Sequence, residues 1–339
     1  MTKRIAVVGA GNLARVRTKA LLATEKVMVC GVASRMLSSA QKFGNEIGCE
    51  KCFDDFKALA DTSPDAVLLE VPHGVQDDIV LWALGQGLHI LIGGCLATSS
   101  IVADEIRRVA SSNQLVVEAG YTARYSASWE KAKRLITDGN LGRIVAIRSI
   151  ALYAADPQSW YYQQNASGGM PLTHMTYGFI NPIRWIFGDP LCVSAFANRI
   201  KQPGPGMVHE ETCVTNLIFD NDTVCSMTAS FVKPGDVPGL SVLFLGTNGA
   251  MELFPSEKSL IIYRGAHAET QDFSSERDAF VVQAEVFLAA LDGLDECRNT
   301  PNDTVGDIRV AEAIVVSSQQ RDTVWLQGKR LCGQQDAGA

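Results

Sequence analysis

The chain has 339 residues, of which 47% are hydrophobic and 20% charged, a composition typical of globular proteins. This length favours two domains over one. The net charge of −7 argues against nucleic acid as a main partner, and no apolar run is long enough to span a membrane. The N-terminus passes from Met-Thr-Lys-Arg directly into a predicted strand, so we expect no secretory signal and a cytoplasmic protein.

Most of the nine cysteines lie inside apolar runs, which is typical of reduced, buried thiols. Cys49 and Cys52 form one C-x-x-C pair, but no second ligand pair accompanies them. Coincidence is therefore favoured over a redox or zinc role. The five histidines show no metal-ligand spacing, and we predict no metal site.

The segment after residue 4 carries the strongest motif. Residues 5–8 predict a buried strand, and a G-x-G-x-x-A turn follows at Gly9, Gly11 and Ala14, with a helix pattern after it. The glycines permit the tight turn and a close backbone approach, and the helix N-terminus offers N–H groups to phosphates. A dinucleotide is the predicted ligand, with Gly9, Gly11, Asn12 and Leu13 in contact with it; the alternative is a strand–turn–helix without ligand.

The first 120 residues alternate strands and helices. Strands are predicted at 5–11, 27–34, 65–72, 89–94 and 115–121, with helices to about 24 and at about 38–47, 76–86 and 99–111. This alternation is typical of a parallel doubly wound sheet, an α/β Rossmann domain over residues 1–121. Its ligand is expected outside the carboxyl ends of the strands.

The pattern changes after a helix predicted at about 129–138. Extended segments are predicted at 145–154, 190–200, 213–220, 223–232, 240–249 and 259–265, with a short closing strand at 323–327. Helical segments are predicted near 174–187, 280–291 and 305–319. We therefore expect an α+β C-terminal domain over 122–339, with a large, mainly antiparallel open sheet, serving substrate binding and oligomerisation.

Several blocks in this order resemble the glucose–fructose oxidoreductase / inositol dehydrogenase / MocA (Gfo/Idh/MocA) family. They are GAGNLA, DAVLLEVP followed by ALGQGLHILIGG, GYTARYSASWEKAKRLITDGNLGRI, GGMPLTHMTYGFINPIRWIFGDP and LFLGTNGAMEL. The resemblance runs nearly end to end. It implies an NAD(P)-dependent oxidoreductase, because members mostly act on sugars, cyclitols and related carbonyl compounds.

The chain departs from the family where its chemistry is expected. The family's fourth strand ends in Glu-Lys-Pro, and that lysine helps to bind and protonate at the reacting oxygen; the matching residues here are Gly93, Gly94 and Cys95. The family's later Gly-Gly-x-x-x-x-Asp-x-x-x-His carries the acid/base histidine. In an alignment from Gly168-Gly169, the aspartate position is His174, the histidine position is Gly178, and the next aspartate is Asn181.

His174 and Tyr177 are therefore the predicted catalytic residues, because hydride transfer to a carbonyl needs a nearby proton donor. Three residues apart on a helix, they would share a face and could act as donor and orienter. The alternative is that both only line a pocket or hold a core hydrogen bond. Further predicted pocket residues are Gly94, Cys95, Tyr121, Arg124, Tyr162 and Asn181. Aromatic residues 160–162 could cover a substrate ring, or form a dimer contact or a lid.

The residues that end the second predicted strand indicate which of the two nicotinamide cofactors the domain binds. An NAD site usually places a carboxylate at its end, whereas this strand ends in Ala33-Ser34-Arg35. Ser34 and Arg35 could bind a 2′-phosphate, with Arg15 and Arg17 adding charge, so the prediction is NADP(H). The alternative for Arg35 is an ordinary exposed residue at a helix start. Pro72 and His73, after the third predicted strand, should approach the nicotinamide.

The sequence thus predicts an NADP(H)-dependent oxidoreductase of specialised metabolism. It would reduce a C=O or C=N group of a small, sugar-like substrate with a non-standard acid/base. The alternatives are a catalytically silent NADP-binding sensor and, less favoured, non-redox chemistry with a retained cofactor. A homodimer or homotetramer is expected through the second sheet, although apolar positions at 213–220 and 223–232 could instead face the domain's own helices.

Overall fold

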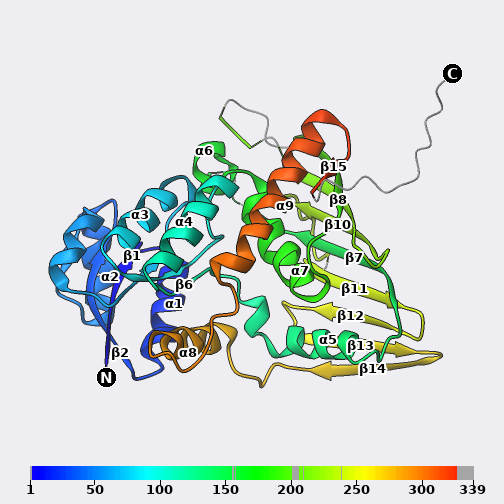
Figure 1. Ribbon diagram of the computed structural model, residues 1–339, viewed down its shortest axis with the longest axis horizontal. Helices are drawn as coiled ribbons and strands as arrows, with labels where there is room; N and C mark the ends of the chain where they lie inside the picture. Colours follow the sequence, from blue (N-terminus) through cyan, green and yellow to red (C-terminus); the bar gives the residue numbers. More distant parts are fainter. Residues whose placement is uncertain are drawn as a thin grey trace.

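The computed structural model describes residues 2–154, 156, 158–200, 206–208, 210–237 and 239–326. Two sheets lie side by side, and helix α9 (Pro301–Gln320) contacts both halves of the molecule (Figure 1). The expected fold class is confirmed: a parallel sheet comes first and a mainly antiparallel sheet second. No helix in the described part of the chain is long and apolar enough to cross a membrane.

The first sheet has six parallel strands in the order β3-β2-β1-β4-β5-β6. The strands are β1 (Lys3–Val8), β2 (Val27–Ala33), β3 (Cys52–Phe53), β4 (Ala66–Leu69), β5 (His89–Ile92) and β6 (Val117–Glu118). The order reverses between β1 and β4, which places the expected ligand position at the carboxyl ends of these two strands.

Alternating side chains of these strands build two apolar layers. Leu68 and Leu91 lie in a cluster with Leu21 of α1 and Phe287 of α8. Their neighbours along the strands join the larger core with helices α3 and α4. The helices are α1 (Asn12–Leu22), α2 (Leu37–Ile47), the 3₁₀ turn η1 (Phe56–Thr62), α3 (His73–Gly85), α4 (Ser100–Ser112) and α8 (Ala279–Leu291). Helix α8 thus covers the first sheet although it belongs to the second half of the chain (Figure 1).

The second sheet has nine strands in the order β14-β13-β12-β11-β7-β10-β9-β8-β15. Only β7 and β10 pair in parallel. The strands are β7 (Ile144–Leu152), β8 (Cys192–Asn198), β9 (Thr212–Ile218), β10 (Val224–Ser230), β11 (Leu240–Gly246), β12 (Ala250–Phe254), β13 (Ser259–Arg264), β14 (His267–Asp272) and β15 (Val324–Trp325).

One face of this sheet is packed and the other is exposed. Cys213, Leu217 and Met227 are buried, while Val214 and Val224 between them are exposed. Most of the apolar alternation seen in the sequence therefore belongs to the face that packs on the domain's own helices. These helices are α5 (Ala127–Thr137), α6 (Gln164–Ser167), α7 (Asn181–Phe187), α9, the 3₁₀ turns η2 (Ala123–Tyr125) and η3 (Trp160–Tyr162), and the π-helix η4 (Pro171–Ile180).

Three strands were not expected from the sequence. β3 is two residues long, and β12 follows β11 after the short Asn248-Gly249 turn. β14 has almost no buried side chain, so its sequence lacks the apolar alternation by which a strand is recognised. Helix α3 begins at His73, three residues earlier than predicted, because Pro72 stands at its N-cap and starts the helix.

Candidate functional site

The loop after β1 forms a cradle of backbone atoms. Gly9 has φ +113°, and a Cβ there would overlap the carbonyl of Glu70, so only glycine fits. Gly11 caps α1 without any side-chain bond, which leaves the first N–H groups of the helix to a ligand. Asn12 and Leu13 are exposed beside it. These residues fit a dinucleotide pyrophosphate.

The end of β2 offers a cation and no carboxylate. Arg35 is exposed and makes no hydrogen bond or ion pair with any residue that the structure describes. The two arginines of α1 are not free in this way: Arg15 binds Glu46, with Nε and Oε2 2.7 Å apart, and Arg17 is buried against Glu70. Of these three arginines, only Arg35 therefore has no hydrogen-bond or ion-pair partner among the described residues.

Three side chains converge on Gly94, the residue predicted from the sequence to align with the family's lysine. A Cβ on Gly94 would lie 2.9 Å from the Nε2 atom of His73 and 2.9 Å from the hydroxyl of Tyr177. The Oε1 atom of Gln76 would be 3.3 Å away. The space that a longer side chain at residue 94 would enter is therefore filled by an imidazole, a phenol and an amide.

His73 is a neutral imidazole. Its Nδ1 lies 3.1 Å from the carbonyl of Ser167, and its Nε2 lies 3.8 Å from the Sγ atom of Cys95. Burial lowers the pKa of His73 to about 4, and burial raises the pKa of the Cys95 thiol. The pair is therefore an uncharged thiol beside an uncharged imidazole at neutral pH, with Nδ1–H donating to the Ser167 carbonyl.

Tyr177 points its hydroxyl at the end of β5. The hydroxyl donates to the carbonyl of Gly93 at 3.0 Å, and the ring packs edge-on against Tyr121 with centroids 4.9 Å apart. Burial raises the pKa of Tyr177 well above its ordinary value. The side chain is thus a protonated hydrogen-bond donor beside Gly94.

His174 lies among aromatic rings. Its ring stacks on Tyr153 at 4.4 Å between centroids, and Tyr161 and Phe231 lie at 4.8 and 4.9 Å. Its Nε2 has no hydrogen-bond partner among the described residues, and burial lowers the pKa of His174 to about 3. In the structure, His174 and Tyr177 therefore have separate neighbours.

The π-helix η4 explains this separation. Its turns are wider than those of an α-helix, so residues three apart are no longer neighbours on one face. The predicted donor and orienter pair rested on α-helical spacing, which this segment does not have.

The two buried histidines predict an acid-sensitive fold. Because their pKa values in the folded protein lie below the unfolded value of 6.5, the unfolded chain takes up protons first as the pH falls. From about pH 7.5 to about pH 5, each should cost about 2 kcal/mol of unfolding free energy. Urea unfolding curves at both pH values measure this loss.

The variant His174→Gln isolates one histidine from the buried carboxylates of Glu118 and Asp307, whose raised pKa values act in the opposite direction. Its unfolding free energy should fall by about 2 kcal/mol less than that of the wild type over the same range. An unchanged pH dependence would contradict the burial of a neutral His174.

A pocket of 340 Å³ opens beside Tyr177. Gly178 lies on its wall, and a Cβ there would make only ordinary contacts, the nearest 3.7 Å away. Sequence reasoning missed the other residues on this wall, because they come from five separate segments without a shared motif. They include Tyr153, Leu240, Lys258, Arg277 and Phe280.

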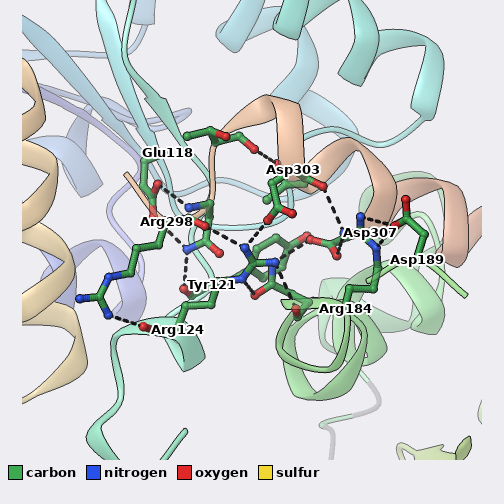
Figure 2. A network of polar contacts seen from close by, with 12 residues as sticks. Glu118, Tyr121, Arg124, Arg184, Asp189, Arg298, Asp303 and Asp307 are labelled. Carbon is green, nitrogen blue, oxygen red and sulfur yellow. Dashed lines mark hydrogen bonds and ion pairs between the residues drawn. The ribbon is translucent and has the colours of Figure 1, made fainter. Parts of the chain in front are cut away.

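Arg124 lies in a buried polar network instead of on this wall (Figure 2), and Asn181 belongs to the same network by its hydrogen bonds. The Nε atom of Arg124 donates to the side chain of Asn181 at 3.0 Å, and Asn181 donates to Asp307 at 2.8 Å. Arg124 also pairs with Asp303, and Arg184 binds Asp307 at 2.5 Å. The network joins the segment after β6 to α7 and α9.

Two further predicted pocket residues are also fully buried. Tyr121 contacts Tyr177 by its ring, and Tyr162 packs on Phe231 with centroids 4.9 Å apart. Among the described residues, no three histidine, cysteine or acidic side chains gather as metal ligands. Cys49 and Cys52 are free thiols, and burial raises the pKa of both.

Comparisons with known proteins agree with this architecture. Residues 3–121 match the model of an oxidoreductase family with an NAD-binding Rossmann fold, and residues 129–252 match the GFO/IDH/MocA C-terminal domain. A dTDP-3,4-didehydro-2,6-dideoxy-alpha-D-glucose 3-reductase of Streptomyces antibioticus is 30% identical over 49% of this chain and 51% of that protein. An inositol 2-dehydrogenase of Rhizobium meliloti is 23% identical over 95% of this chain and 98% of its own.

Among solved structures, levoglucosan dehydrogenase in complex with NADH and levoglucosan superposes with a TM-score of 0.88 at 18% identity. The match covers 96% of this chain and 100% of that one. The resemblance predicted from the sequence is therefore confirmed, and this chain is an oxidoreductase that belongs to the Gfo/Idh/MocA family, with an NAD-binding Rossmann fold in its first half.

Proposed function

We propose that this protein is an NADP(H)-dependent reductase acting on a C=O or C=N group of a small, sugar-like compound of specialised metabolism. The observation that supports it best is the meeting of Tyr177 and His73 at Gly94, where a phenol donor replaces the expected lysine. Two of the relatives described above act, by their names, on a dTDP-linked keto sugar and on inositol. The cradle of Gly9 and Gly11 fits the cofactor.

Tyr177 and His174 have different roles in the proposed reaction. When held in the cradle of Gly9 and Gly11, a reduced nicotinamide would supply a hydride to the substrate carbon, and this would leave negative charge on the substrate oxygen. Tyr177 can turn its O–H from the Gly93 carbonyl toward that oxygen and donate to it. His174, whose pKa is about 3, stays neutral and packs among the rings of Tyr153, Tyr161 and Phe231. An iminium substrate would need this donor less, because reduction consumes its positive charge.

The test is calorimetric binding of NADPH and NADH, followed by turnover of NADPH with a panel of keto sugars and imines. Tight NADPH binding with turnover of a panel member supports the proposal. Binding without any turnover favours the alternative, a dinucleotide-binding sensor on the same fold. Binding of neither dinucleotide would contradict the proposal outright.

Replacing Arg35 by alanine should weaken NADPH binding while NADH binding stays the same. A charge-assisted hydrogen bond contributes about 1.5–3 kcal/mol, so we expect a loss of about 10- to 150-fold in NADPH affinity. Calorimetry with both dinucleotides measures it. Lys42→Ala, which removes another cation from neighbouring α2, is the control and should leave both affinities unchanged. Equal losses for NADPH and NADH would disprove the phosphate contact.

We propose further that two copies pair through the exposed face of the second sheet. Phe196 on β8 is 59% exposed and lies opposite Val214 on β9, which is also exposed. Such an apolar pair on a sheet surface fits burial against a second copy. Phe196→Asp should weaken dimerisation about tenfold or more, as measured by sedimentation, whereas Val316→Asp on the exposed face of α9 should not. A dimer unaffected by Phe196→Asp would place the interface elsewhere.

A further inference from the structure

Glu70 follows β4, and its side chain lies over the backbone of Gly93, which follows β5. The two positions are equivalent on neighbouring parallel strands, since Leu69 pairs with Ile92. A Cβ on Gly93 would overlap the Glu70 carboxylate, so residue 93 has no room for a side chain while Glu70 is in place. This space can hold a side chain from either strand but not from both at once.

Arg17 of α1 holds this carboxylate. Its Nε lies 2.5 Å from Oε1 of Glu70, and the two side chains are only 4% and 8% exposed. The remaining nitrogens of Arg17 donate to the carbonyls of Gly93 and Gly120, at 3.3 and 2.5 Å, and to Oε1 of Gln283 at 2.6 Å. The cation therefore ties together the ends of β4, β5 and β6, and Glu70 neutralises it.

The same Gly93 carbonyl accepts the hydroxyl of Tyr177 at 3.0 Å. Tyr177 and Arg17 thus share one acceptor, and the position of that acceptor depends on the Arg17–Glu70 pair. Position 93 matches the glutamate of the family's Glu-Lys-Pro, so this chain carries its carboxylate on the neighbouring strand instead.

We propose that Glu70 is a positioning residue: together with Arg17 it fixes the Gly93 carbonyl and, through it, the Tyr177 hydroxyl at the edge of the first sheet. It does from β4 what a glutamate at residue 93 would do from β5. The part that concerns Tyr177 rests on the function proposed above, whereas the shared carboxylate position does not.

The shared position is tested by thermal unfolding of four proteins: wild type, Glu70→Ala, Gly93→Glu and the double variant. In the wild-type background, Gly93→Glu should lower the unfolding midpoint, because its side chain overlaps Glu70. In the Glu70→Ala background, it should raise the midpoint, because it gives Arg17 a new partner. A lower midpoint in both backgrounds would overturn the shared position. This readout needs neither cofactor nor substrate.

The positioning role is tested by turnover in a double-mutant cycle with Tyr177→Phe, using NADPH and the panel member that the wild type reduces. Glu70→Ala should lower kcat about tenfold or more with Tyr177 present, and less than about twofold without it. NADPH affinity, measured by calorimetry, should stay within about threefold of wild type in each protein. Equal effects of Glu70→Ala in both backgrounds would show a merely structural role and overturn the proposal.

Two controls separate the possible failures. The partly exposed ion pair of Lys3 and Asp292, at the opposite end of the sheet, should give no kcat effect when replaced as Lys3→Met/Asp292→Leu. The double variant Glu70→Ala/Gly93→Glu should recover kcat to within about threefold of wild type. If the wild type reduces nothing in the panel, the proposed function fails, while the unfolding experiment still decides whether the two strands share one carboxylate position.

Discussion

Tyr177→Phe should lower kcat by about a hundred- to ten-thousandfold, the contribution of a positioned proton donor. The fold should tolerate the change, because Arg17 still donates to the Gly93 carbonyl after the hydroxyl is gone. Dinucleotide affinity should stay the same, since the cradle at Gly9 and Gly11 is untouched. Steady-state kinetics with NADPH and a keto sugar of the panel, together with calorimetry, measures both quantities.

Tyr263→Phe is the matched control, because it removes a phenol from β13 on the remote sheet. It should leave kcat unchanged. A Tyr177→Phe enzyme with kcat within threefold of wild type would contradict a donor role. A loss of affinity in place of kcat would show that Tyr177 binds cofactor or substrate and takes no part in proton transfer.

The second large effect concerns stability. Asp307 is fully buried, and Arg184 and Asn181 both bind its carboxylate, so Asp307→Ala leaves a buried cation short of its counter-charge (Figure 2). We expect a loss of about 3–5 kcal/mol in the free energy of unfolding, measured by urea denaturation. The exposed partner Asp189 stays in place and keeps the loss within this range.

Two comparisons show whether burial causes the effect. Asp104 pairs with Arg309 on the exposed side of the same helix α9, so Asp104→Ala should cost less than about 1 kcal/mol. Arg184→Met/Asp307→Leu, which removes both charges, should recover much of the stability lost in Asp307→Ala. A small effect of Asp307→Ala would mean that water or Asp189 compensates Arg184.

Local patterns in the sequence predicted much of the fold. The Gly9 turn and the alternation of strands and helices predicted that the first sheet is parallel. Both patterns depend only on residues that are close together in the sequence. Strand β14 and the π-helix η4 could not be predicted in this way. The first has no buried face, and the second has no apolar periodicity that separates it from an α-helix, so the α-helical spacing assumed for His174 and Tyr177 did not hold.

Candidate site residues could be predicted from the sequence only where one segment supplies them. The glycine motif alone points to Asn12 and Leu13, and the residues that end β2 alone point to Arg35. The partnership of Arg17 with Glu70 spans 53 positions of sequence, and the pocket beside Tyr177 takes its wall from α8 and the second sheet. Such contacts depend on how distant elements pack, which no local pattern records.

The late position of α8 and α9 in the chain bears on how the molecule is made. As the chain leaves the ribosome, residues 1–121 emerge first, but the apolar face that α1 and α2 cover in part stays incomplete until Phe287 and its helix follow. Arg124 and Arg184 likewise cannot form their ion pairs with Asp303 and Asp307 until α9 has been synthesised. The nascent first half must therefore stay soluble with an incomplete core until almost nine-tenths of the chain has been synthesised, a stage at which chaperone binding would be most useful.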